Sequence, residues 1–175
     1  TGAENTAVGH FALKLNTTAS YNTAVGHGAL QSNTTGSHNT SVGLDSLFTN
    51  VTGSRNVAVG LNALVNNTNS DNVAVGYVAL ANNTSGNSNV AVGAYTLDAN
   101  TTASDVTAVG RNALTANTTG ASNTGLGSHA LSNNTTGASN TACGVNASAA
   151  NTTGAGNVAI GNSALLTNTE AIDNV

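Results

Sequence analysis

Apolar and polar residues recur at fixed places along the whole chain. A short segment in which β-branched and small residues alternate, Asn22-Thr23-Ala24-Val25-Gly26, returns nine more times with modest variation. The copies begin at residues 5, 22, 39, 56, 72, 89, 106, 123, 140 and 157, so the step is 17 residues apart from one step of 16. A fixed period of this size predicts a solenoid. We therefore treat residues 1–175 as one repeat array, in which equivalent residues of successive coils form columns.

Each copy predicts a short β-strand at the start of its coil. Side chains alternate along a strand, so Thr23 and Val25 share one side and Ala24 lies on the other. The Thr23 column contains only Thr or Val, and the Val25 column is mainly Val. β-Branched residues at alternate positions favour a strand with one buried face. We expect Thr23 and Val25 to point into the core and Ala24 to point outward.

A glycine closes every one of these strands. Glycine at such a position predicts a left-handed backbone or a close approach that leaves no room for a Cβ atom. The column consists of Gly9, Gly26, Gly43, Gly60, Gly76, Gly93, Gly110, Gly127, Gly144 and Gly161.

The remainder of each coil contains a second apolar segment and a polar turn. Ala29-Leu30 follows the glycine, with Leu at the second place in nine copies and Ser148 in the other. The turn after it begins at an asparagine in all ten copies, and asparagine satisfies local backbone groups in turns. Stacked coils also predict an amide ladder along this column. The column is Asn16, Asn33, Asn50, Asn67, Asn83, Asn100, Asn117, Asn134, Asn151 and Asn168.

These features together predict an all-β fold, a parallel β-solenoid of about ten coils. A 17-residue coil with a glycine corner and an Asn-Thr-Thr-Gly turn leaves no room for a stable helix. The one short repeat lacks a residue between Thr68 and Asn72, within the turn. We expect this loss to leave the strand columns in register.

The predicted core is thin, which favours self-association. About two large aliphatic side chains per coil bury too little apolar surface to offset the ordering of the backbone. The Ala24 and Ala29 columns are small residues, and we expect them to face a second copy of the chain around a symmetry axis. On this hypothesis Ala58→Leu and Ala74→Leu block assembly.

Composition excludes several classes of partner. Three Lys or Arg residues and a net charge of −4 provide no basic patch for nucleic acid or an anionic membrane. No apolar run reaches the ~20 residues that cross a bilayer. Cys143 stands in the Val25 column, so we expect a small buried hydrophobe. Because the chain starts at Thr1 and breaks off as another copy opens, we expect it to be a piece of a longer repetitive protein.

The repeat N-T-A-V-G-x-x-A-L-x-x-N-T-T-G resembles the head and shaft regions of trimeric surface fibres. These are trimeric autotransporter adhesins, whose head repeats carry a similar S-V-A-[IV]-G core, and phage tail-fibre-like proteins that end in an endosialidase-type chaperone domain. The similarity covers the whole chain and is closest to the fibre type in Asn22 to Gly43 and Thr107 to Gly127. The resemblance implies a left-handed β-roll assembled as a homotrimer, outside the cell or on a virion, that serves as a spacer or display shaft and could also adhere to a cell-surface ligand.

The repeat offers little chemistry. Catalysis needs chemically different side chains close together, whereas a translational repeat places identical side chains next to one another. His10 and His27 share a column and are expected ~5 Å apart, but Leu44 follows them, so we interpret them as stacked surface histidines. We expect no enzymatic activity, no cofactor and no metal site.

Ice binding is the alternative function. A threonine column on a low-charge solenoid face is typical of ice-binding proteins, and thermal hysteresis would test it. The column is interrupted only by Val51 and consists of Thr17, Thr34, Thr68, Thr84, Thr101, Thr118, Thr135, Thr152 and Thr169.

Overall fold

The computed structural model describes residues 2–174 and confirms the all-β solenoid. Each of the ten copies forms one strand of three residues. No helix long and apolar enough to cross a membrane occurs in residues 2–174. The strands are β1 (Thr6–Val8), β2 (Thr23–Val25), β3 (Thr40–Val42), β4 (Val57–Val59), β5 (Val73–Val75), β6 (Val90–Val92), β7 (Thr107–Val109), β8 (Thr124–Leu126), β9 (Thr141–Cys143) and β10 (Val158–Ile160).

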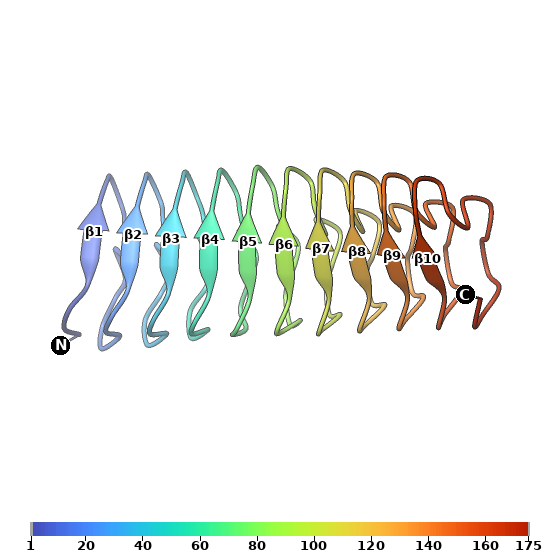
Figure 1. Ribbon diagram of the computed structural model, residues 1–175. Coiled ribbons are helices and arrows are strands. Elements are labelled where there is room, and N and C mark those ends of the chain that lie inside the picture. Colours follow the sequence, from blue (N-terminus) through green and yellow to red (C-terminus); the bar gives the residue numbers. More distant parts are fainter. Residues whose placement is uncertain (1, 175) are drawn as a thin grey trace.

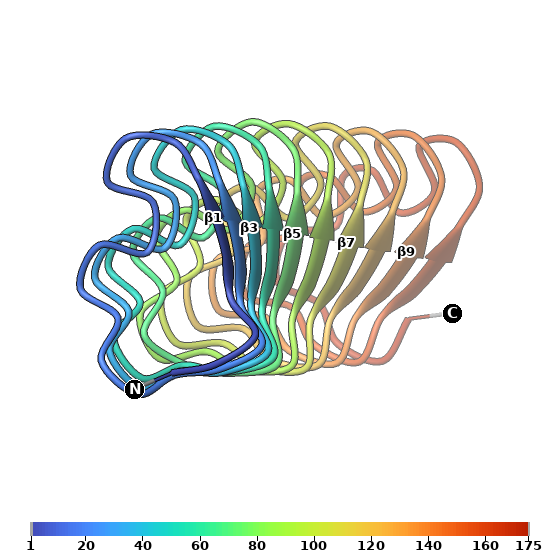
Figure 2. The same cartoon turned by 90° about the vertical axis from the view of Figure 1, so that its left-hand side faces the viewer.

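All ten strands form one parallel sheet in sequence order. Equivalent residues pair from coil to coil, so Thr23 lies beside Thr40 and Val25 beside Val42. Seen from the sheet side with its strands pointing up, the chain advances from left to right (Figure 1), which makes the solenoid left-handed. The end view in Figure 2 shows the coils stacked with the sheet along one side and the turns along the other.

Coil-to-coil hydrogen bonds extend beyond the strands. In the second apolar segment the Leu30 N–H donates to the Ser46 carbonyl at 3.0 Å, and the Ser32 N–H donates to the Phe48 carbonyl at 3.2 Å. Leu30 has a φ of 53°, a left-handed value that recurs along its column. The chain is therefore bonded to its neighbouring coils on several sides.

The short repeat keeps its register, as the sequence predicts. Val57 of β4 pairs with Val73 of β5, and Val59 pairs with Val75. In the shortened turn, the Asn69 carbonyl accepts hydrogen bonds from the amides of Asn56 and Asn67, the role that the Gly53 carbonyl has in the preceding coil. The loss of one residue is therefore confined to the turn.

The prediction of which strand side is buried is wrong. Ala24 is 0% exposed, whereas Thr23 and Val25 are only partly buried, and the same pattern recurs in the inner coils. The interior contains the Ala24, Ala29 and Leu30 columns. A Cβ atom built on Gly125, in the Ala24 column, would lie 3.1 Å from the Leu114 Cδ1. The coil is too narrow for a larger side chain here, so the small residues mark the inside of the coil.

This inversion also corrects the proposed interface. Ala58 and Ala74 are both completely buried. Ala58→Leu and Ala74→Leu would therefore overpack the coil interior and disrupt the fold. The Ala29 column is buried too, so neither alanine column can meet a second chain.

The glycine column has the conformation and the crowding that the sequence predicts. Gly26 has a φ of 134°, and a Cβ atom there would lie 2.5 Å from the Gly43 carbonyl oxygen of the next coil. Any other residue would be strained in φ and would clash with the adjacent backbone. Glycine is thus required by coil stacking at this corner.

Candidate functional site

The Asn33 column forms a buried amide ladder. The Asn50 Nδ2 donates to the Gly53 carbonyl at 2.9 Å within its own turn and to the Asn33 Oδ1 of the preceding coil at 3.1 Å. The same pattern links Asn134 to Asn117 and Asn151 to Asn134, each at 2.7 Å. Because the members from Asn33 to Asn151 are fully buried, each amide closes a turn and also joins two coils.

A second ladder, which the sequence analysis did not identify, lies in the Asn22 column. The Asn39 N–H donates to the Asn22 Oδ1 at 2.9 Å, and the Asn22 Nδ2 donates to the Gly36 carbonyl at 3.0 Å. The Asn33 Nδ2 donates to the same Gly36 carbonyl at 2.8 Å, so both ladders converge there. The signal was visible in the sequence, because asparagine precedes nine of the ten strands.

Val106 interrupts the second ladder. It stands in the Asn22 column, is fully buried and lacks an amide. The Asn123 Nδ2 instead reaches both the Gly120 carbonyl, at 3.0 Å, and the Gly137 carbonyl, at 2.6 Å. Asn123 thereby supplies a bond to Gly120 that an asparagine at position 106 would otherwise make.

Threonine hydroxyls in the Thr17 column also join the coils. The Thr17 Oγ1 donates to the Thr34 carbonyl at 2.9 Å, and the Thr118 Oγ1 donates to the Thr135 carbonyl at 3.1 Å. These side chains lie in turns outside the sheet. Their hydroxyl protons are directed along the stack toward the next coil.

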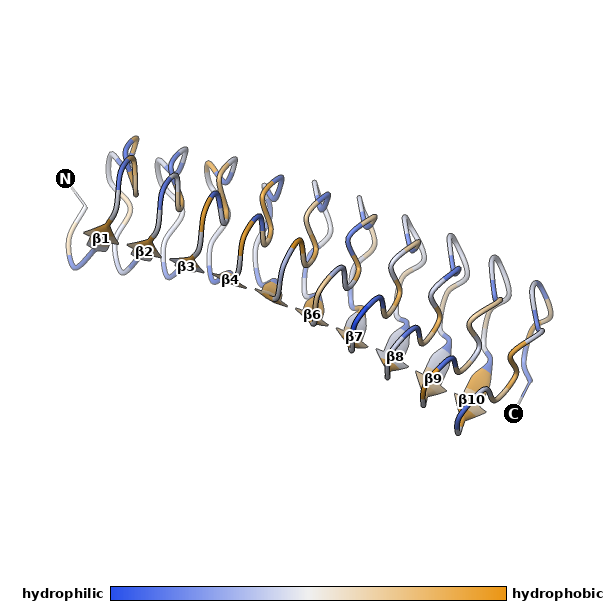
Figure 3. Cartoon of the chain, turned by 90° about the horizontal axis from the view of Figure 1, so that it is seen from above, coloured by the Kyte–Doolittle hydropathy of each residue, from blue (hydrophilic) through white to orange (hydrophobic). Residues whose placement is uncertain are grey.

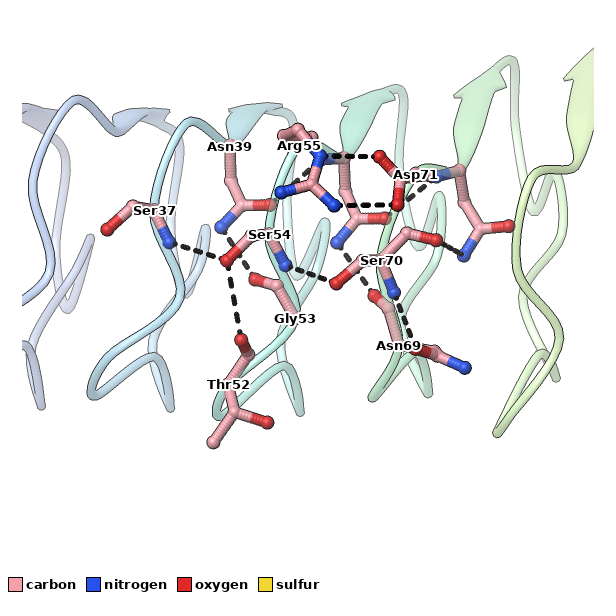
Figure 4. Close-up of polar contacts among 11 residues, drawn as sticks. Ser37, Asn39, Thr52, Gly53, Ser54, Arg55, Asn69, Ser70 and Asp71 are labelled. Atoms are coloured by element: carbon pink, nitrogen blue, oxygen red, sulfur yellow. Dashed lines mark hydrogen bonds and ion pairs between the residues drawn. The ribbon is translucent and has the colours of Figure 1, made fainter.

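The edge of the sheet beside the short coil carries an ion pair and a serine ladder (Figure 4). The Arg55 guanidinium donates two hydrogen bonds to the Asp71 carboxylate, at 2.6 and 2.8 Å. These bonds lower the pKa of Asp71 and raise that of Arg55. Beneath the pair, the Ser37 N–H donates to the Ser54 Oγ and the Ser54 N–H donates to the Ser70 Oγ, both at 3.0 Å. The short coil is thus tied to its predecessor by side chains as well as by the sheet.

The outward side of the sheet carries two columns of side chains, one apolar and one of Thr or Val, and we call it the strand face. Figure 3 shows the strands along one long side of the array, with β6 and β10 coloured toward the hydrophobic end. The face contains the Thr23 column, in which Val replaces Thr in β4, β5, β6 and β10. It also contains Val8, Val25, Val42, Val59, Val75, Val92, Val109, Leu126, Cys143 and Ile160.

Two observations show that these side chains are in contact with solvent in the single chain. Val75 is 36% exposed and Val109 is 38% exposed, although both lie in strands far from the two ends of the array. Cys143 is also exposed, so the prediction that it is buried is wrong. The cause is the same inversion, because Cys143 occupies an outward position of β9.

Histidine and aromatic side chains lie at the corners of the coils. The His10 and His27 ring centroids are 5.2 Å apart, which agrees with the spacing expected from their column. Tyr77 and Tyr95 form an edge-on pair at 5.1 Å, and the nearby Tyr77 raises the pKa of Tyr95. Within residues 2–174 no three metal-ligating side chains cluster and no pocket is present. The features of the described residues that could contact a partner are therefore the columns of side chains along the surface of the array.

Comparison with protein-family models found no matching family, and comparisons with curated proteins and with solved structures found no match either.

Proposed function

We propose that this chain is a structural segment of an extracellular or virion fibre, which associates side by side with copies of itself through the strand face. The observation that carries the proposal is the row of outward Val, Leu, Ile and Cys side chains, which continues along all ten strands. Such a segment acts as a spacer or display shaft. Its partner is a second copy of the same chain, and the resemblance to trimeric fibres favours three copies about a common axis.

The size of the strand face supports contact with another copy. Nine steps of ~4.8 Å between adjacent strands give a strip about 43 Å long. With a width of roughly 10 Å, its area is on the order of 400 Å², which matches the largest apolar patches of ordinary monomers, and such patches are often functional. Covering Val75 and Val109 would add the apolar burial that the narrow coil interior cannot supply.

The ladders suit a mechanical role. Each coil is joined to the next by strand pairing, by two asparagine ladders and by threonine hydroxyls. Repeated bonds of this kind resist separation of the coils, at about 0.5–1.5 kcal/mol for each net hydrogen bond. Repetition supplies length, and the ladders supply stiffness.

Ice binding by the Thr17 column finds less support from the geometry. The hydroxyls of Thr17 and Thr118 donate to carbonyls of the next coil, so their protons are already engaged. They also lie in turns and not in the strands of the sheet.

The mass and shape of the folded segment test the proposal. We expect a multiple of the chain mass in sedimentation equilibrium and elongated particles in electron micrographs. A compact monomer at all concentrations, or thermal hysteresis from a monomer, would contradict the fibre function.

A further inference from the structure

We infer that the associated copies run parallel and level, with Asp105 of one copy paired to Arg111 of the next. This inference rests on the proposed self-association and specifies its register. It is carried by two exposed, oppositely charged residues at the two ends of the same strand, β7.

Asp105 and Arg111 cannot pair within one chain. Asp105 lies just before β7 and Arg111 just after it, on opposite long edges of the strand face. Five residues lie between them, among them the whole of β7, whose three residues alone span about 10 Å. Among residues 2–174 the ion pairs are His27–Asp45 and Arg55–Asp71, so neither Asp105 nor Arg111 has an ionic partner in its own chain.

Rotation about an axis parallel to the solenoid brings the two edges together. When the strand faces of such copies turn toward that axis, the edge after the strands of one copy meets the edge before the strands of the next. When the two copies are at the same position along the solenoid axis, Arg111 of one copy then meets Asp105 of its neighbour. Two antiparallel copies that face each other would instead bring the Arg111 edge against another Arg111 edge.

The other strands are compatible with level register. At no strand do the residue before it and the residue after it, on the two edges of the strand face, carry charges of the same sign. At β1 the edges carry Glu4 and His10, at β4 Arg55 and Leu61, and at β5 Asp71 and Tyr77. The remaining strands have no Lys, Arg, Asp or Glu on either edge. Their edge residues, before and after the strand, are Tyr21 and His27 at β2, His38 and Leu44 at β3, Ser88 and Ala94 at β6, Ser122 and Ser128 at β8, Ser139 and Val145 at β9, and Gly156 and Asn162 at β10.

Level register places Arg111 against an unpaired carboxylate. The other acidic residues that precede a strand on that edge are Asp71, two coils away and already bound to Arg55, and Glu4, six coils away. A shift of one coil in either direction would place Arg111 against Ser88 or Ser122, neither of which carries a charge. Arg55, by contrast, is already held by Asp71 through two hydrogen bonds and needs no partner across the contact. The single free arginine thus distinguishes between registers.

Charge exchange tests the pairing. Arg111→Asp should weaken self-association in low salt by about two- to fivefold, the usual size of an exposed ion pair. Asp105→Arg combined with Arg111→Asp should restore it, and about 1 M salt should remove the difference. If the double variant associates no better than Arg111→Asp, the pairing is wrong.

Cross-linking tests the register independently. In a Cys143→Val background, chains with both Asp105→Cys and Arg111→Cys should form covalent oligomers with a short bis-maleimide reagent. Either cysteine alone should not, nor should Asp105→Cys combined with Leu44→Cys, four coils away. Cross-linking of Arg111→Cys alone would overturn the parallel arrangement.

Sedimentation of the wild-type chain separates the two possible failures. An oligomer without a 105–111 cross-link and without charge rescue would overturn the level register and leave the fibre function intact. A wild-type monomer would overturn both.

Discussion

The Val106 N–H donates to the Asn89 Oδ1 at 3.0 Å, but Val106 has no side-chain oxygen to offer to the next coil. The equivalent bond is made by Asn140, whose N–H donates to the Asn123 Oδ1 at 2.8 Å. The second asparagine ladder is therefore broken at one coil.

Val106→Asn should repair this ladder. The new amide can donate to the Gly120 carbonyl and accept from the Asn123 N–H, so we expect about 1–2 kcal/mol of added stability from two buried hydrogen bonds. Chemical denaturation measures this change. Asn140→Val should produce a loss of similar or larger size, and stabilisation by both substitutions would contradict the ladder's role.

Ser148→Leu should also stabilise the fold. Ser148 replaces leucine in the Leu30 column, is nearly completely buried, and its hydroxyl has no hydrogen-bond partner. Its φ of 49° matches the 52° of Leu131, so leucine fits the backbone. Filling the space and removing the unpaired hydroxyl should add about 2 kcal/mol.

The exposed Ser85→Leu provides the control for Ser148→Leu. Ser85 lies in a turn at the surface, so its substitution should change the free energy of unfolding by less than about 0.5 kcal/mol. Equal effects at the two positions would show that the Leu30 column does not form the core.

The Arg55–Asp71 pair predicts a small dependence on pH. The folded pKa of Asp71 lies below its ordinary value because Arg55 donates hydrogen bonds to the carboxylate. The stabilisation is therefore complete above the unfolded pKa of about 3.9 and is lost as the pH falls through the folded pKa. Asp71→Asn should be slightly less stable than wild type at pH 7, and the difference should vanish in strong acid. A difference that grows on acidification would contradict the assignment.

Much of this fold follows from the period of the sequence. The 17-residue step, the Gly26 column and the Asn33 column predict stacked parallel coils with a closed corner, and the structure has these features. The position of the shortened turn was predictable for the same reason, since only a turn can lose a residue without moving strand side chains to the other face.

The inside and outside of the coil could not be assigned from alternation. Alternation places Thr23 and Val25 opposite Ala24, but it does not say which side is the core. The usual rule that β-branched residues are buried fails here because Leu30 and Ala29 fill a coil too narrow for Val at the Ala24 position. A column of β-branched residues that alternates with a column of alanine is the pattern that could have revealed this.

Cys143 reports whether the strand face is covered. Its thiol is exposed in the single chain and lies in β9 on that face. We expect slow reaction with a maleimide in the associated wild-type protein and fast reaction in a dissociated variant, because a buried thiol is inaccessible to the reagent. Equal rates in the two states would place the contact elsewhere.

Sedimentation velocity of two matched pairs of substitutions tests assembly through the strand face most directly. Val92→Asp with Val109→Asp places two charges on the strand face, whereas Thr102→Asp with Thr119→Asp places two charges in exposed turns of the same coils. Charges buried without partners strongly oppose association. We expect a folded monomer for the valine pair and an unchanged oligomer for the threonine pair. An oligomer of wild-type mass for the valine pair would contradict assembly through the strand face.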